Sequence, residues 1–376
     1  MNDCAVIGGG VVGLSIAYEL ARHGLQVLLL ERGFCGQEAS WAGAGILPAA
    51  TLREEDAAYE RLAGLSAGLH AQWAENLQDE TGIDTGYHRC SEIFFQHEEI
   101  SGDPLSRDRH LLEARGIRVE ILDRAAIEQL EPQLAAGICE DQEKNIYHTP
   151  DSAQVRNPRH LRALKTACIQ RGVQIVEQAT VEGFDLLGER IVTARTTAGA
   201  YSAEHFCLAA GAWTPQLTEM LQCKIPIKPI RGQIALLQSD ERLLSNIIHQ
   251  GGHYLVPRPD GRILVGSTLE DVGFEKKTTL SAIRELLQFA ETRVSGLAAA
   301  KVERCWAGFR PASPDGYPYI DTVPGFVNGW LAAGHYRWGL FLSPATAVLM
   351  GQCIRGEPTC VPQDAFLIGR TVEPVV

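Results

Sequence analysis

The stretch Gly8-Gly9-Gly10-Val11-Val12-Gly13 decides the fold class, because its first, third and sixth residues form the pattern G-x-G-x-x-G. A short apolar run, residues 4–7, precedes it, and apolar side chains then recur every four residues, the spacing of one helix face. Residues 27–30 form a second apolar run, which Glu31 closes. The segment therefore predicts a β-α-β unit that binds a dinucleotide.

Each element of this unit has a physical role. Gly8 permits the tight turn, Gly10 lets the backbone approach a pyrophosphate, and Gly13 lets the helix lie close to the strand. The free N–H groups at the helix start attract phosphates. Glu31 is placed to accept hydrogen bonds from both ribose hydroxyls and disfavours NADP, since a 2′-phosphate would meet its charge. NAD and FAD both remain open at this point.

The next segment, residues 36–47, favours a flavin. It is rich in Gly, Ala and Ser, and small residues let the backbone lie against a flat ring. A flexible loop is the alternative reading. Trp41, Ile46 and Leu47 suit a buried segment better than a solvated one, so we expect contact with the ligand.

The rest of the chain predicts two intermixed domains. A helix begins at Asn157-Pro158, strands follow over 173–210, and the C-terminal part ends in a helix over 345–355. Between them, residues 221–305 read as antiparallel strands and one amphipathic helix. We expect an α/β fold with a discontinuous Rossmann-like FAD-binding domain and an α+β substrate domain with an antiparallel sheet. The first domain comprises residues 1–85, 150–220 and 306–376, and the second comprises residues 86–149 and 221–305.

Composition narrows the class of protein. The 376 residues carry a formal charge of −12, which repels nucleic acid and anionic membranes. No run of 18 apolar residues predicts a membrane span, and the first ten residues lack the features of a signal peptide. None of the ten cysteines forms a C-x-x-C pair, so we expect no metal site and a reducing, cytoplasmic location. Homo-oligomerisation remains open.

Three segments together resemble the D-amino acid oxidase family of flavoproteins, and most closely its glycine-oxidase branch in the thiamine pathway. They are Gly8 to Gly13, Ser40 to Leu47, and Gly334 to Leu340 with the preceding Ala307-Gly308-Phe309-Arg310-Pro311. The resemblance extends over the whole chain, and it implies FAD as the cofactor. It also implies a substrate domain of antiparallel strands that lies over the flavin.

The resemblance also implies roles for individual residues. Arg310 would pair with the substrate carboxylate, which a planar guanidinium fork can bind through two hydrogen bonds. Tyr254 would donate its hydroxyl to the same carboxylate, and Arg337 would lie near both flavin and substrate. Leu269 and Ile46 would line a small side-chain pocket. The expected cofactor contacts are Gly8, Gly10, Val11, Val12, Gly13, Glu31, Arg32, Ala39, Ser40, Ala44, Gly45, Ile46, Leu47, Val181, Gly211, Gly334, His335, Arg337, Trp338, Gly339 and Leu340.

The reaction implied is oxidative deamination of glycine or another small amino acid by hydride transfer to flavin, with no protein acid or base. An imine would result, which hydrolyses to a keto acid and ammonia or enters thiazole synthesis, and oxygen would be reduced to hydrogen peroxide. Alternatives are a sarcosine or D-amino acid oxidase, a dehydrogenase that passes electrons to a quinone, an NAD-dependent dehydrogenase, and a non-catalytic nucleotide sensor. Trp338 stands where related sequences carry a polar residue. We expect non-covalent FAD, although Cys305 matches a flavin-linked cysteine of related sarcosine oxidases.

Overall fold

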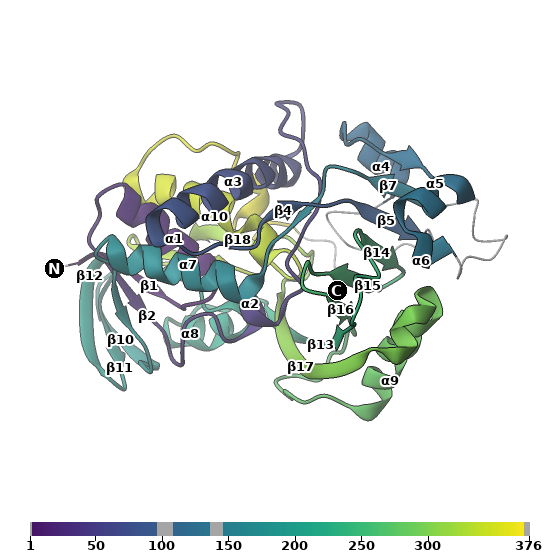
Figure 1. Ribbon diagram of the computed structural model, residues 1–376. Helices are drawn as coiled ribbons and strands as arrows, with labels where there is room; N and C mark the ends of the chain where they lie inside the picture. Colours follow the sequence, from purple (N-terminus) through teal and green to yellow (C-terminus); the bar gives the residue numbers. More distant parts are fainter. Residues whose placement is uncertain (1, 96–107, 136–145, 372–376) are drawn as a thin grey trace.

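The computed structural model describes residues 2–95, 108–135 and 146–371, which form two sheet-based parts side by side (Figure 1). In the first part, strand β1 lies at the centre of a sheet and is parallel to both of its neighbours. The parallel strands are β19 (Gly329–Ala333), β12 (Gly199–Leu208), β1 (Asn2–Ile7), β2 (Val27–Leu30) and β9 (Gln174–Val176). Since both faces of such a sheet are covered, its strands are continuous apolar runs.

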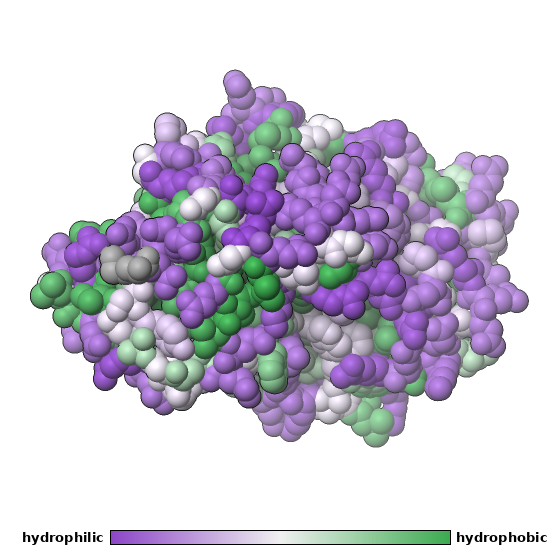
Figure 2. All heavy atoms as spheres, turned by 60° about the vertical axis from the view of Figure 1, so that its left-hand side comes forward, coloured by the Kyte–Doolittle hydropathy of each residue, from purple (hydrophilic) through white to green (hydrophobic). Residues whose placement is uncertain are grey.

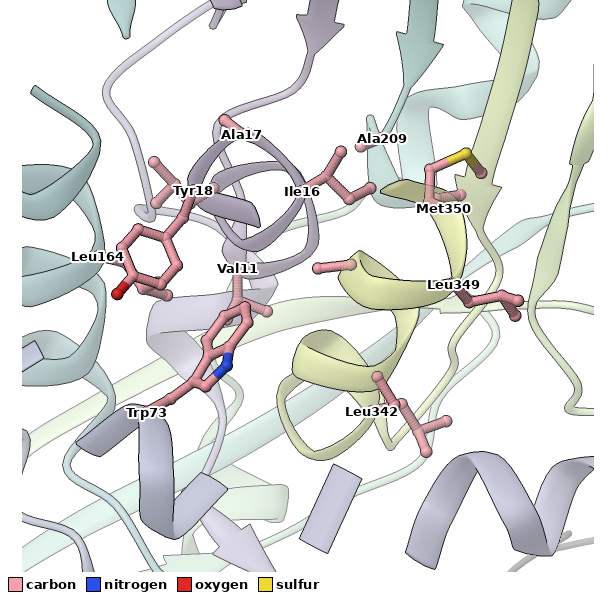
Figure 3. Packing of buried hydrophobic residues seen from close by; sticks show 14 of the residues in the cluster. Val11, Ile16, Ala17, Tyr18, Trp73, Leu164, Ala209, Leu342, Leu349 and Met350 are labelled. Carbon is pink, nitrogen blue, oxygen red and sulfur yellow. The ribbon is translucent and has the colours of Figure 1, made fainter. Parts of the chain in front are cut away.

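Four helices lie over one face of this sheet: the first and the last pack on its strands, the two between them pack on those helices, and side chains from all four meet in one core (Figure 3). They are α1 (Val11–Arg22), α3 (Ala58–Thr81), α7 (Asn157–Gln170) and α10 (Gly339–Arg355). In their common core, Tyr18 of α1 meets Trp73 of α3 edge to face at 5.1 Å, and Leu349 comes from α10. The other face is covered by the hairpin of β10 (Val181–Leu187) and β11 (Arg190–Thr196) with α8 (Thr214–Met220).

The second part is built on an eight-stranded sheet in which only β14 and β5 pair in parallel. In order, its strands are β17 (Lys301–Ala312), β13 (Lys228–Gln238), β16 (Arg262–Gly266), β15 (His253–Pro257), β14 (Ile247–Gln250), β5 (Glu92–Phe95), β7 (Ile146–Thr149) and β6 (Glu120–Ile121). One face packs on α9 (Leu280–Arg293), α5 (Arg124–Leu130) and α6 (Pro132–Ala135). The expected domain boundary at 305/306 falls inside β17.

Short elements connect the two parts. A three-stranded sheet joins β3 (Ile46–Leu47), β8 (Ala153–Gln154) and β4 (His88–Arg89). Other short elements are α2 (Ala39–Ala42), α4 (Arg109–Ala114) and β18 (Tyr319–Thr322), which pairs antiparallel with β19 in the first sheet. No helix in the described ranges is both long and apolar enough to cross a bilayer. The face shown in Figure 2 is mostly hydrophilic, with scattered apolar areas.

The last helix corrects the prediction from the sequence. We expected a helix over 345–355, but α10 begins at Gly339 and contains Pro344. A proline inside a helix frees the carbonyl four residues before it. Here the Ser343 hydroxyl donates to that carbonyl, on Leu340, at 2.9 Å. The next carbonyl, on Phe341, accepts hydrogen bonds from Ser66 at 2.5 Å and from His70 at 2.8 Å. Side chains therefore let the helix continue through the proline.

Candidate active site

A cavity of about 410 Å³ lies where the carboxyl ends of the parallel strands meet the second sheet. Its floor begins directly after β1 at Gly8, after β2 at Glu31, after β12 at Ala209 and after β19 at His335. Ligands of open α/β sheets bind at this edge, because loops after parallel strands diverge there. The opposite wall comes from β13, β14, β15 and β17.

The glycine turn has the geometry that its sequence predicts. Gly8 has φ +117°, and a Cβ atom there would lie 2.4 Å from the Ala209 carbonyl oxygen. A Cβ on Gly13 would lie 1.9 Å from the Gly8 carbonyl oxygen, so Gly13 packs helix against strand and does not line the cavity. Gly10 lines the cavity, and at the first residue of α1 the N–H of Val11 donates to Ser40 Oγ at 2.8 Å.

Glu31 closes the floor of the cavity. Its carboxylate accepts hydrogen bonds from the backbone N–H of Gly9 at 2.6 Å and of Gly33 at 2.8 Å. Next to it, the Arg32 guanidinium lies 3.7 Å from the ring centre of Trp213. Val181, with its two preceding residues, lines the same end. Because one oxygen of Glu31 already holds the turn at Gly9, its carboxylate is fixed in orientation before any ligand binds.

The small-residue segment after α2 is held by side chains from distant elements. The Ala42 carbonyl accepts the indole N–H of Trp306 at 3.0 Å, and the Ala44 carbonyl accepts a hydrogen bond from Arg258 Nη2 at 2.6 Å. Arg258 also donates to the Val155 carbonyl at 3.0 Å. Burial lowers the pKa of Arg258 to about 10, so it stays charged at neutral pH. Sequence reasoning assigned no role to Arg258, although a charge at the end of an apolar strand was a usable signal.

Two residues of the second sheet, Arg310 and Tyr254, face the other end of the cavity. Both lie over glycines: a Cβ on Gly232 would lie 2.4 Å from Arg310 Nη1, and a Cβ on Gly266 would lie 2.4 Å from Tyr254 Cζ. Arg310 bonds only to neutral oxygens, and burial lowers its pKa. No carboxylate within the described ranges pairs with it. The charge of Arg310 is therefore left for a ligand.

The turn between β19 and α10 supplies the third wall. His335 Nε2 lies 3.0 Å from Thr346 Oγ1, and burial lowers the pKa of His335 to about 3. This imidazole is neutral at pH 7 and is a weak base. Arg337 and Trp338 also line the cavity, and Arg337 Nε has no hydrogen-bond partner in the described part of the chain. The start of α10 adds a partial positive charge at the same place.

Four of the predicted site residues do not line the cavity. Gly13 and Gly334 shape its turns, and Leu47 belongs to the core of the helical layer. Leu269 is the clearest correction. Its side chain is 52% exposed, because the extended chain after β16 alternates and turns Thr268 inward and Leu269 to solvent. Leu269 therefore does not form a wall of the small side-chain pocket that we predicted.

The other predicted residues come together around the cavity from separate elements. Those that line it are Gly8, Gly10, Val11, Val12, Glu31, Arg32, Ala39, Ser40, Ala44, Gly45, Ile46, Val181, Gly211, Tyr254, Arg310, His335, Arg337, Trp338, Gly339 and Leu340. Sequence reasoning missed an aromatic wall in which Phe94 stacks on Tyr147 at 4.9 Å and on His249 at 4.8 Å. These three residues come from different strands and show no common sequence pattern.

Comparison with known proteins agrees with this geometry. Residues 3–353 match the model of the DAO family, described as FAD dependent oxidoreductase. The chain belongs to this family. It is 36% identical over 367 residues to a glycine oxidase of Pseudomonas aeruginosa, covering 97% of this chain and 98% of the relative. It is also 34% identical to the bifunctional protein ThiO/ThiG of a Nostoc species, of which it covers 52%. The crystal structure of glycine oxidase from Geobacillus kaustophilus superposes with a TM-score of 0.90 at 29% identity, covering 99% of both chains.

As a member of this family the protein is an FAD-dependent oxidoreductase, and the cavity fits that cofactor. It is continuous from the glycine turn and Val181 to Arg310 and Tyr254. Gly8, Gly10 and the start of α1 would hold the pyrophosphate, Glu31 the ribose, and the small-residue segment the flavin ring. Cys305 does not line the cavity, since it packs on the α9 side of the second sheet.

Proposed function

We propose that the protein is an amino acid oxidase that removes two electrons and two protons from the C–N unit of glycine or another small amino acid, as a hydride from carbon and a proton from nitrogen. The products would be the imine, or its keto acid and ammonia, and hydrogen peroxide from dioxygen. The uncompensated guanidinium of Arg310 at one end of the cavity is the observation that carries this proposal. A half-buried cation without an acid partner favours an anionic ligand, and a carboxylate fits its planar fork.

The side chains around Arg310 support a role in orientation rather than in proton transfer. Tyr254 would donate its hydroxyl to the carboxylate that Arg310 holds, and Arg337 would add a second positive charge nearby. Bound FAD would supply the electron acceptor. His335 is too weak a base to take a proton at neutral pH, because burial lowers its pKa to about 3. We infer that the substrate enters with a neutral amine and that the protein contributes position and electrostatics.

The relatives support glycine as the first substrate to test, since two of them are glycine oxidases. The similarity to ThiO/ThiG supports delivery of the imine to thiazole synthesis. The alternatives are sarcosine or a D-amino acid as substrate, and a quinone as electron acceptor. We further propose that the protein acts in the cytoplasm and binds FAD without a covalent link.

A substrate panel tests the proposal. Purified holoenzyme would be mixed with glycine, sarcosine, D-alanine and D-proline, and peroxide release would be measured. We expect turnover with glycine, and reoxidation of the substrate-reduced flavin when oxygenated buffer is added. No flavin bleaching by any of the four amines under anaerobic conditions would contradict the proposal. Bleaching by glycine without reoxidation by oxygen would instead favour a dehydrogenase.

A further inference from the structure

The orientation of Arg310 depends on a short loop, Ser267–Glu270, that follows β16. Arg310 Nη2 donates to Ser267 Oγ at 2.6 Å, and Arg310 Nη1 donates to the Thr268 carbonyl at 3.1 Å. Gly232 lies beneath the guanidinium and leaves the room that its plane occupies. The position of this loop therefore sets the direction in which the Arg310 guanidinium faces the cavity.

Glu270 holds the loop on β13. Its Oε1 atom accepts hydrogen bonds from Gln233 Nε2 at 2.7 Å and from Thr268 Oγ1 at 2.5 Å. Its Oε2 atom pairs with Arg231 Nη2. The backbones of Arg231 and Glu270 exchange two further hydrogen bonds, of 2.8 and 3.0 Å. Thr268 Oγ1 in turn accepts the N–H of Gln233 at 3.0 Å, so the threonine hydroxyl links the loop to the strand and also holds Glu270 within the loop.

Arg231 and Arg310 differ in the hydrogen-bond acceptors that they contact: carboxylates contact Arg231, and neutral oxygens contact Arg310. The side chain of Arg231 is 3% exposed and pairs with the carboxylates of Glu270 and Glu275. Arg310 receives only a carbonyl and a hydroxyl from the same loop. Burial raises the pKa of Glu270, but hydrogen bonds from Arg231, Thr268 and Gln233 outweigh this and lower it. Glu270 thus stays charged and is neutralised by Arg231, and Arg310 keeps its charge for a ligand.

We propose that Thr268 and Glu270 are positioning residues that orient Arg310 toward the substrate carboxylate. Neither side chain lines the cavity, so their effect acts through the loop. The inference rests on the proposed carboxylate-binding role of Arg310 and identifies what sets it. A disturbed loop lets the guanidinium turn, which weakens every carboxylate ligand alike and leaves the electron transfer step of bound substrate nearly unchanged.

The test uses Thr268→Val in the holoenzyme, since valine keeps the shape and removes the hydroxyl. We expect KM for glycine, and the Kd of glycolate measured by the flavin absorbance change, to rise about tenfold with kcat within about threefold. Thr268→Ser retains the hydroxyl and should restore both values. Thr193→Val is the matched control, because the Thr193 hydroxyl bonds the hydroxyl of Ser202 on β12 and neither residue lines the cavity.

Glu270→Gln is the second variant, with the same expected rise in KM and Kd and full FAD content. Unchanged KM and Kd in both variants would overturn the inference, as would an equal loss of kcat with KM unchanged. Loss of FAD from both variants would overturn it too, since the loop would then support the fold and not the arginine. The glycolate titration needs no turnover, so it tests the loop even if the wild-type protein oxidises none of the amino acids in the panel.

Discussion

Arg310 is half-buried and has only neutral hydrogen-bond partners, so replacing it tests whether its charge binds the substrate. We expect Arg310→Ala to lower kcat/KM for glycine by an amount that corresponds to about 2–5 kcal/mol, because a charge-assisted contact in the transition state is lost. FAD content should stay close to one per chain. Arg304→Ala is the control, since Arg304 is an exposed residue of the same strand. Equal kcat/KM values for Arg310→Ala and wild type would remove Arg310 from the carboxylate role.

Gly10 gives a second prediction at the scale of one residue. A leucine side chain there would enter the space beside Ser40, where the pyrophosphate is expected, so Gly10→Leu should purify without colour. Gly68→Leu is the matched control, because a Cβ at Gly68 meets no atom within 4 Å. The flavin absorbance relative to protein absorbance measures occupancy. Full occupancy in Gly10→Leu would show that the nucleotide lies elsewhere.

Cys305 bears on the mode of attachment of the flavin. Burial raises the pKa of its thiol, and the side chain packs on the α9 side of its sheet. A protonated thiol that faces away from the cavity is a poor nucleophile toward the flavin. We expect acid precipitation to release all the yellow colour into the supernatant, with the same result for Cys305→Ala. Colour that stays with the wild-type pellet and is lost in the variant would establish a covalent link.

At the scale of elements, the first turns of α10 depend on α3. The Phe341 carbonyl accepts hydrogen bonds from Ser66 and His70 in place of a regular helix partner. Ser66→Ala should lower the free energy of unfolding by about 1–3 kcal/mol. The loss should be smaller in a Pro344→Ala background, since without the proline ring the N–H of Ala345, which bonds Ser66 Oγ at 3.4 Å, can bond the Phe341 carbonyl directly. Chemical denaturation of the four proteins in this cycle measures the difference. Strictly additive losses would mean that Pro344 and Ser66 are independent.

At the scale of the whole molecule, buried histidines predict sensitivity to acid. Burial lowers the pKa to about 4 for His70 and to about 3 for His160 and His335. In the unfolded chain a histidine has a pKa near 6.5. Between about pH 6.5 and pH 4 the unfolded chain therefore binds protons that the folded protein does not, and the free energy of unfolding falls as pH falls, by up to about 1.4 kcal/mol per pH unit for each histidine.

Urea unfolding at pH 7.5 and pH 5 would measure this loss. His160→Leu should reduce the pH dependence by about one proton, because His160 is buried and neither of its ring nitrogens has a hydrogen-bond partner in the described part of the chain. His110→Leu is the control, since the His110 side chain is 74% exposed. An unchanged pH dependence in His160→Leu would show that other groups cause the loss of stability at low pH.

Local patterns explain which parts of the molecule the sequence predicted. The β-α-β unit over residues 4–31 and the strands over residues 173–210 follow from turn chemistry and from the spacing of apolar residues, both of which act over a few residues. The start of α10 was missed because a proline usually interrupts a helix, and here Ser343 and Ser66 bond the carbonyls near it, of which Ser66 lies far away in sequence. Leu269 faces solvent because of the way its loop packs on β13. No local sequence pattern predicts this packing.

The same limit applies to the site. The glycines and Arg310 could be predicted because few roles fit a glycine in such a turn or a charge in an apolar segment. The resemblance then assigned their roles. The aromatic wall of Phe94, Tyr147 and His249 could not be predicted, because its position arises from strand order in the second sheet. In a site that lies between two sheets, sequence predicts only those residues whose type alone limits their possible roles.

The cavity is bounded by residues from Ile7 near the start of the chain to Phe341 near its end, and this has a consequence for synthesis of the protein. The glycine turn leaves the ribosome early, but its opposite walls follow much later. A nascent chain that ends before Gly334 already holds every strand of both sheets, yet lacks the turn and helix start that complete the third wall. We therefore expect FAD to bind only after translation is complete. Truncated chains should be colourless and should be degraded by proteases.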